Sequence, residues 1–391
     1  MKYTLKPYQE TASAEILSRL DEANEARSIK KPASFALSAP TGAGKTVIAS
    51  DVFERLLLPS DDRVPDENAV ILWFSDNPDL NRQSRHRIEG ASSHLASRTV
   101  EIDSSFIRSE LEQGKIYFLN TQKLSKGSLL TGGRKKSSNF ELFEAAPNTG
   151  QVTIWDTLRN TLESPDHNVY FVVDEAHRGS GKQSDRETIL HRLIAGHTPD
   201  GATAPVPPMP VVMGISATPG KFKTMMHNMP GARLVLDDVD VPVDEVQESG
   251  LLKDIVELQI PGEEGEAFEN VFVTQAAGLL AESTRRWAAY HAEQGGDGKR
   301  VVPLMVVQMK DLATPEDMYR VIQSLREGWP ELPYDCFAHV FGEHTPIQAG
   351  DVLVPYVDPQ SVEDRDWIRV LFAKTAISTG WDCPRAEVMV S

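Results

Sequence analysis

A glycine-containing segment that ends in lysine and threonine is the first place where this sequence could do chemistry. Residues 39–46 read Ala-Pro-Thr-Gly-Ala-Gly-Lys-Thr, with Ala39 where the usual pattern opens with glycine. The segment lies between an expected strand at 34–38 and an expected helix at 45–58, so that backbone N–H groups and the helix N-terminus can converge on a polyphosphate. Lys45 can reach the β- and γ-phosphates, and the Thr46 hydroxyl can ligate magnesium. The predicted phosphate contacts are Thr41, Gly42, Ala43, Gly44, Lys45 and Thr46.

Two consecutive carboxylates follow the apolar run 169–173. Such a run is typical of a central parallel strand, and chemistry in open α/β sheets lies beyond the carboxyl ends of the strands. Asp174 is predicted to hold magnesium, and Glu175 to orient and deprotonate an attacking water. His177 is expected to couple parts of the protein, because no second His or Cys lies at zinc-like spacing. A simple helix cap would explain the acidic pair alone, but together with the phosphate loop it favours a catalytic set of Lys45, Asp174 and Glu175.

Alternating strands and helices predict how these residues are positioned. Strands are expected at 34–38, 69–75, 99–102, 115–120, 169–173 and 211–216, which implies a parallel, doubly wound sheet. A first lobe is expected to span 1–238 and a second 239–391. In the second lobe we expect helices at 266–294 and 315–329 and strands at 300–309, 369–373 and 387–390.

Further motifs in the same order carry a resemblance to a known family. Together with Ser216-Ala217-Thr218, the phosphate loop and Asp-Glu-Ala-His resemble a superfamily-two helicase or translocase. Tyr8-Gln9 resembles the opening adenine motif, and Thr379-Gly380-Trp381-Asp382 resembles the fifth motif. The Tyr-Gln opening, the Arg after Asp-Glu-Ala-His and the Gly-Trp-Asp string look most like the Res subunits of type III restriction enzymes.

The resemblance implies an α/β fold of two RecA-like P-loop NTPase lobes, each a parallel sheet flanked by helices. It implies ATP and Mg²⁺ as cofactors and nucleic acid as a partner, with a methyltransferase or specificity subunit and a nuclease domain as further candidates. The chain stops before the Gln-x-x-Gly-Arg-type motif of the family, so we expect the second lobe to be truncated at its C-terminus. The resemblance also implies roles for individual residues. Adenine is expected to be bound by Tyr8 and Gln9, and the nucleotide site is expected to include Gly380 and Asp382. Coupling between the nucleotide and nucleic-acid sites is expected from His177, Ser216 and Thr218, and contacts to nucleic acid from Gln83, Thr121, Gln122, Gln308 and Thr379.

Composition limits the possible partners. The net charge is −17, from 40 basic and 57 acidic residues, which argues against general nucleic-acid binding but not against a motor with one positive track. Arg82, Arg85, His86 and Arg87 could belong to such a track or to a solvated surface. The sequence shows no membrane-span-like run and no signal-peptide pattern, so we expect a cytoplasmic protein without a membrane partner.

Three functions stay open at the level of sequence. The first is a DNA helicase or translocase serving restriction or phage defence, the second is a motor on RNA, and the third is an ATP-binding module without its own turnover. The type III-like features and the Gly-Trp-Asp string favour DNA. The missing arginine motif is the observation that favours the third.

Overall fold

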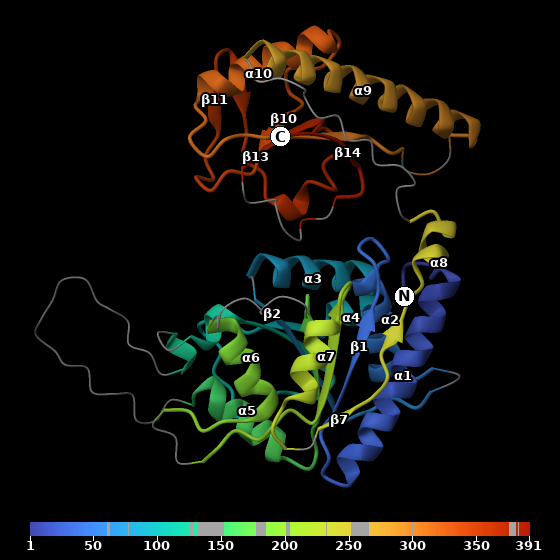
Figure 1. The fold of residues 1–391 in the computed structure, drawn as a ribbon, viewed down its shortest axis with the longest axis vertical. Coiled ribbons are helices and arrows are strands. Elements are labelled where there is room, and N and C mark those ends of the chain that lie inside the picture. Colours follow the sequence, from blue (N-terminus) through green and yellow to red (C-terminus); the bar gives the residue numbers. More distant parts are fainter. Residues whose placement is uncertain are drawn as a thin grey trace, which may run out of the picture. The chain divides into compact units, whose positions relative to one another are not determined.

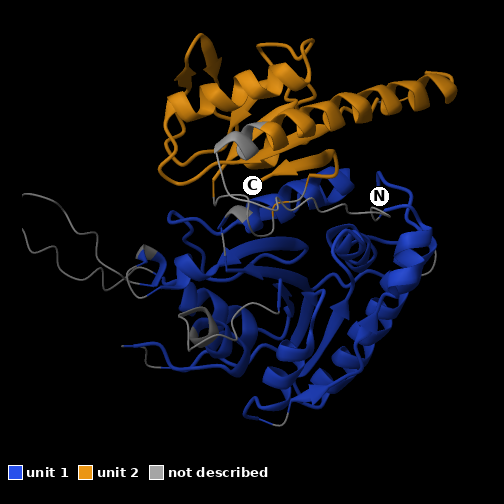
Figure 2. Cartoon of the chain, turned by 45° about the horizontal axis from the view of Figure 1, so that its top comes forward, with its two compact units in different colours: residues 1–256 blue, residues 257–391 orange. Residues whose placement is uncertain are grey.

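The computed structural model describes residues 1–60, 63–76, 78–125, 128–131, 152–176, 185–200, 204–231, 233–251, 266–296, 298, 300–374, 381 and 383–391. The chain forms two compact units, residues 1–256 and 257–391 (Figures 1 and 2). The predicted functional division at 238/239 stays a prediction. Within the described ranges, no helix is both long and apolar enough to cross a bilayer.

A parallel sheet forms the centre of the first unit (Figure 1). Its strand order is β3-β4-β2-β5-β6-β1-β7, with β8 also paired to β1, and every pairing is parallel. The predicted parallel fold is therefore confirmed. The strands are β1 (Ala33–Ser38), β2 (Ala69–Ser75), β3 (Thr99–Glu101), β4 (Lys115–Asn120), β5 (Asn168–Asp174), β6 (Val211–Ser216), β7 (Leu234–Val235) and β8 (Val239–Asp240).

Helices cover both faces of this sheet, as the nearly continuous apolar strands require. Alternate strand residues point to opposite faces: Trp73 belongs to the same buried cluster as residues of α1, α2 and α8, whereas Phe74 belongs to the cluster that includes residues of α5, α6 and α7. The helices are α1 (Pro7–Ser28), α2 (Lys45–Leu57), α3 (Pro78–Ala91), α4 (Ser93–Ala96), α5 (Ile154–Glu163), α6 (Asp185–Ala195), α7 (Gly220–His227) and α8 (Val243–Glu248), and the 3₁₀ turns are η1 (Thr121–Leu124) and η2 (Leu129–Thr131).

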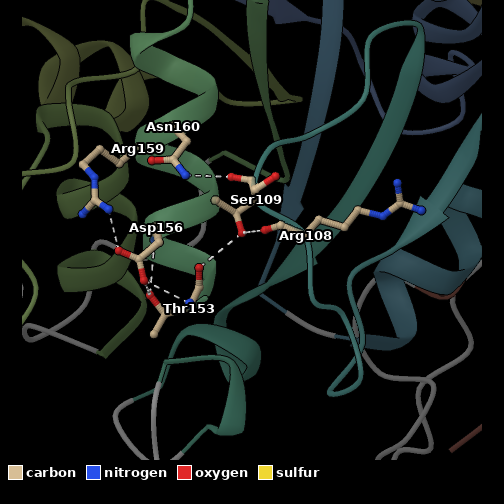
Figure 3. A network of polar contacts seen from close by, with 7 residues as sticks. Arg108, Ser109, Thr153, Asp156, Arg159 and Asn160 are labelled. Carbon is tan, nitrogen blue, oxygen red and sulfur yellow. Dashed lines mark hydrogen bonds and ion pairs between the residues drawn. The ribbon is translucent and has the colours of Figure 1, made fainter. Parts of the chain in front are cut away.

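Helix α5 is fixed at its start by side-chain hydrogen bonds (Figure 3). Thr153 and Asp156 cap each other's backbone N–H groups, and Arg159 donates to Asp156 at 2.6 Å. Asn160 Nδ2 donates to the carbonyl of Ser109 at 3.0 Å, which joins α5 to the segment before β4. A capping box of this kind satisfies two backbone donors that the helix itself leaves unpaired.

The second unit holds a smaller parallel sheet of order β10-β13-β9-β14 and an antiparallel hairpin of β11 and β12. Its two long helices, α9 and α10, pack so closely that only glycine fits at position 328 of α10: a Cβ there would lie 2.1 Å from the carbonyl oxygen of Thr274 on α9. The elements are α9 (Glu266–Glu293), β9 (Leu304–Gln308), α10 (Pro315–Gly328), β10 (Phe337–His339), β11 (Ile347–Ala349), β12 (Val352–Val354), η3 (Pro359–Ser361), β13 (Val370–Ala373) and β14 (Ala386–Val390).

Candidate active site

Strand β6 lies between β1 and β5 and brings the phosphate loop and the acidic pair together at the carboxyl ends of the strands. In the register of the sheet, Ile215 lies beside both Leu37 of β1 and Asp174 of β5. Past the strand ends, the Ala39 N–H donates to the Ser216 carbonyl at 3.1 Å, and the Ala176 N–H donates to the Ile215 carbonyl at 3.0 Å. The two predicted motifs, 135 residues apart at Ala39 and Asp174, therefore flank a single strand end.

The phosphate loop needs glycine at two positions. Gly42 has φ 88° and Gly44 has φ 76°, in the left-handed region where a side chain is costly. A Cβ on Gly44 would also lie 2.6 Å from Gln9 Nε2. Gly44 caps α2, so Lys45 and Thr46 occupy the first turn of a helix whose N-terminus favours anions.

Lys45 lies over its own loop. Its Nζ atom donates to the carbonyls of Ala39 at 3.3 Å and Pro40 at 3.4 Å. Its charge is also among the influences that lower the pKa of Asp174. The Lys45 amine is therefore bonded to the phosphate loop and lies within electrostatic reach of the Asp174 carboxylate.

The opening motif contacts the back of the phosphate loop. Tyr8 and Gln9 are both 4% exposed, and both donate to the Ala43 carbonyl, at 2.8 Å from Tyr8 OH and 3.1 Å from Gln9 Nε2. The Gln9 Oε1 atom accepts from the Lys6 N–H at 3.0 Å. Adenine recognition by these residues stays a prediction, but their contacts give them a structural task that the sequence did not indicate: they hold the loop in shape.

Asp174 is the strongly perturbed acid of the site. Its pKa is raised from 3.8 to about 6: burial is the main cause and the Glu175 carboxylate adds to it, while hydrogen bonds from Ser84 and the Glu175 N–H and the charge of Lys45 oppose the rise. Glu175 itself has φ 50°, an uncommon conformation for a residue other than glycine. Strain of this kind and a perturbed carboxylate are both typical of functional sites.

Ser84 was missed by the sequence reasoning. Its hydroxyl donates to Asp174 Oδ2 at 2.9 Å from the middle of α3. The one available signal was its position on the buried face of an amphipathic helix, in line with Leu80 and Ile88. A polar residue on such a face needs a partner.

The remaining predicted residues that the structure describes lie at or after strand ends, except for Gln83 on α3. Thr218 N–H donates to Ser216 Oγ at 3.0 Å, which makes a tight turn after β6. Thr121 and Gln122 begin η1 directly after β4, and Thr121 Oγ1 is a buried atom for which the described residues provide no hydrogen-bond partner. Gln83 lies on α3, Gln308 is the last residue of β9 and is exposed, and His177, Thr379, Gly380 and Asp382 lie outside the described residues.

The oxygen atoms of Thr46 and Asp174 are the predicted magnesium ligands. The described residues contain no cluster of three or more His, Cys, Asp or Glu side chains that could hold a metal ion by themselves. One buried carboxylate at Asp174 and one hydroxyl at Thr46 instead suit a cation that takes most of its ligands from phosphates and water, as Mg²⁺ does.

The family model described as type III restriction enzyme, res subunit, matches residues 2–221, more than half of the chain. The chain belongs to this family. As a member of this family, the chain is a helicase-class enzyme that uses ATP, which means a nucleic-acid-dependent ATPase. The match covers the phosphate loop, the acidic pair and the Ser-Ala-Thr turn.

Solved structures give a weaker likeness to the res-subunit chain. A point variant of S. cerevisiae Dbp5 bound to a Gle1 variant and IP6 is 13% identical, with a TM-score of 0.47, over 92% of this chain and 69% of that one. DEAD-box helicase Mss116 bound to ssRNA and UDP-BeF is 14% identical, with a TM-score of 0.45, over 98% of this chain and 64% of that one. At these scores the likenesses carry no functional argument. No curated protein matches the sequence.

Proposed function

We propose that this res-subunit chain is an ATP-driven DNA translocase or helicase that works in the cytoplasm in restriction or phage defence. The observation that carries the proposal is the arrangement around β6, which brings the lysine-bearing loop and the acidic pair to one strand edge. An anion-binding helix start beside two carboxylates is what hydrolysis of a bound triphosphate requires.

Each residue of this edge has a proposed task. Lys45 and the backbone N–H groups of 41–46 hold the β- and γ-phosphates, and Tyr8 and Gln9 bind adenine from their position against Ala43. Lys45 leaves the Ala39 and Pro40 carbonyls to do so, which is possible because those hydrogen bonds are long. We further propose that Gly380 and Asp382 complete the nucleotide site.

Magnesium fits the donors that Thr46 and Asp174 offer. When bound, the ion neutralises phosphate charge and so favours departure of the terminal phosphoryl group. Burial without an ion keeps the pKa of Asp174 near 6, and a divalent cation beside the carboxylate would stabilise its ionised form.

Glu175 is the proposed general base. It follows β5 with φ 50°, its N–H donates to Asp174 Oδ1 at 2.9 Å, and its carboxylate is close enough to Asp174 to raise the pKa of that acid. Its carboxylate accepts a proton from the attacking water, whose oxygen forms the new bond to the γ-phosphorus while the bond to the leaving diphosphate breaks.

Ser216 and Thr218 are proposed to couple the nucleotide site to nucleic acid, together with His177. Their turn begins at the Ser216 carbonyl, which is bonded to the phosphate loop, so a change at the phosphates reaches it directly. The proposed nucleic-acid contacts are Gln83 on α3, Thr121 and Gln122 directly after β4, Gln308 at the end of β9, and Thr379, which lies outside the described residues.

DNA is favoured over RNA by the family's description as a restriction-enzyme subunit. A methyltransferase or specificity subunit and a nuclease domain are the proposed partners, because translocation alone neither selects a site nor cuts a strand. Contacts to phosphate and sugar suit a motor that must pass over any sequence.

The test is ATP hydrolysis by the purified chain with double-stranded DNA, single-stranded DNA and RNA at one fixed salt concentration, since salt alone changes such affinities strongly. We expect the largest stimulation with DNA. Stimulation by RNA alone would move the function to RNA, and unstimulated or absent hydrolysis with all three would contradict the proposal.

A further inference from the structure

We propose that Ser84 is a positioning residue that links helix α3 to Asp174, so that nucleic acid bound along α3 accelerates ATP hydrolysis. The inference rests on the proposed function, which makes Asp174 part of the nucleotide site and α3 part of the nucleic-acid track. It adds a route between the two that runs through one hydroxyl group.

The contact is short, partly buried and distant in sequence. Ser84 Oγ donates to Asp174 Oδ2 at 2.9 Å, and Ser84 is 6% exposed. A hydrogen bond to a charged acceptor in such a place is stronger than one between neutral groups. The bond therefore restricts the orientation of the carboxylate, and it does so from an element that takes no other part in the nucleotide site.

Helix α3 presents two different faces. Leu80, Ser84 and Ile88 recur at intervals of four residues and are buried. Arg82 and His86 lie two residues away from Ser84 on either side, close to the opposite face of the helix, and both are exposed. The helix thus carries basic side chains on one side and the bond to Asp174 on the other.

Ion pairs and hydrogen bonds fasten α3 to its surroundings at both ends. Near its start, Ser75 Oγ of β2 donates to the buried Asn81 Oδ1 at 2.8 Å. Farther along, Glu89 Oε1 accepts from Thr99 Oγ1 of β3 at 2.6 Å, and Arg85 Nη1 lies 3.6 Å from Glu101 Oε2 of the same strand. These contacts make α3 one ordered element, so nucleic acid on its exposed face and the Ser84–Asp174 bond act on the same rigid helix.

The consequence is a coupling between two binding events. If nucleic acid on α3 favours the Asp174 orientation that suits magnesium and ATP, then magnesium and ATP must strengthen nucleic-acid binding by the same factor. This reciprocity supplies a binding measurement that does not depend on catalysis.

The test compares Ser84→Ala with Ser84→Thr and with the matched control Ser92→Ala. Ser92 is also buried, follows α3 directly and accepts a hydrogen bond from the Leu95 N–H, but it does not contact Asp174. Two quantities are measured for each protein. One is the ratio of DNA-stimulated to unstimulated ATP hydrolysis. The other is the change in affinity for a fluorescent ATP analogue with Mg²⁺ when a saturating DNA oligonucleotide is added.

We expect Ser84→Ala to reduce both ratios by roughly fivefold or more, the lower end of typical coupling between sites. Ser84→Thr, which keeps the hydroxyl, should retain them, and Ser92→Ala should lose thermal stability without losing coupling. Wild-type ratios in Ser84→Ala, or an equal loss in Ser92→Ala, would overturn the inference. If the wild-type chain itself shows no stimulation by any nucleic acid, the proposed function fails, which is a different result.

Discussion

Each end of strand β5 has a partly buried carboxylate beside it, and the two carboxylates have opposite roles. At the amino end, Asp66 accepts from Tyr170 OH at 2.7 Å, from Asn168 Nδ2 at 2.9 Å and from the Asn68 N–H at 3.1 Å. At the carboxyl end, Asp174 accepts from Ser84 and from the Glu175 N–H, but a second carboxylate lies beside it. The first carboxylate is surrounded by donors, whereas the second shares its site with a like charge.

The difference separates a stabilising network from a site prepared for a ligand. Burial raises the pKa of Tyr170, and the negative charge of Asp66 raises it further, so the tyrosine keeps its proton and donates. Burial likewise raises the pKa of Asp174 to about 6, but there the charged form is the one the chemistry needs. A functional carboxylate held against its own preference lowers stability, which is a common cost of active sites.

The largest expected effect is that of Asp174→Asn. ATP hydrolysis should fall by about 100-fold or more, because the amide cannot supply the charge that holds a cation at the phosphates. The ligand-free variant should at the same time be more stable than wild type at neutral pH, by about 3 kcal/mol, because an amide is cheaper to bury than a carboxylate whose pKa is raised from 3.8 to about 6.

The pH dependence of the stability difference between wild type and Asp174→Asn shows whether ionisation of Asp174 is its cause. The pKa of Asp174 is about 6 in the folded chain and starts from 3.8, so the folded chain binds the proton more tightly. Wild-type stability should therefore fall relative to Asp174→Asn as the pH rises through that window, and the difference should level off above it. Thermal melting in EDTA without nucleotide measures this, and a pH-independent difference would contradict the comparison.

Asp66→Ala should have the next largest effect, and on stability alone. The substitution leaves the Tyr170 hydroxyl and the Asn168 amide without their acceptor, at a cost of about 2–4 kcal/mol. Denaturation should show this loss, while ATP hydrolysis well below the melting temperature stays near the wild-type rate. The neighbouring Glu67→Ala removes the same charge from an exposed position and should change neither.

Tyr170→Phe should give the smallest effect, about 1 kcal/mol of stability. It removes one of the donors to Asp66 and the acceptor of the Asn24 amide, whose nitrogen lies 2.7 Å from Tyr170 OH. Tyr3→Phe, at a residue that is 53% exposed, is the control in the same melting experiment. A loss from Tyr170→Phe as large as that from Asp66→Ala would mean that a single bond carries the network.

Sequence patterns predicted the fold where the signal was long. The six strands predicted for the first unit lie within one residue of their predicted bounds, because apolar runs such as 69–75 are unambiguous, whereas the two-residue strands β7 and β8 were not predicted. The three-residue strands β10, β11 and β12 were not predicted, since such short segments carry no periodicity. The pattern of residues 8–20 predicts a helix over that range, but α1 continues to Ser28, because Ala23 and Ala26 extend its buried face among charged residues.

In the candidate site, contiguous motifs could be predicted from the sequence, but contacts between distant residues could not. The loop at 39–46 and the pair Asp174-Glu175 are contiguous motifs, so their residue types alone suggested the chemistry. Contacts between distant residues had no such signal: Ser84 with Asp174, and Tyr8 with the Ala43 carbonyl. Both depend on the strand order and on how helices pack over the strand ends, which spacing along the chain does not reveal.

Glu175→Gln tests the central claim most directly, because it keeps the size of the side chain and removes only its ability to accept the proton. Hydrolysis of ATP in the presence of DNA should fall by about 100-fold or more, at the lower end of what a general base contributes, while affinity for an ATP analogue stays near that of wild type. Turnover by Glu175→Gln at the wild-type rate would contradict the assignment of this strand edge as the place where ATP is cleaved.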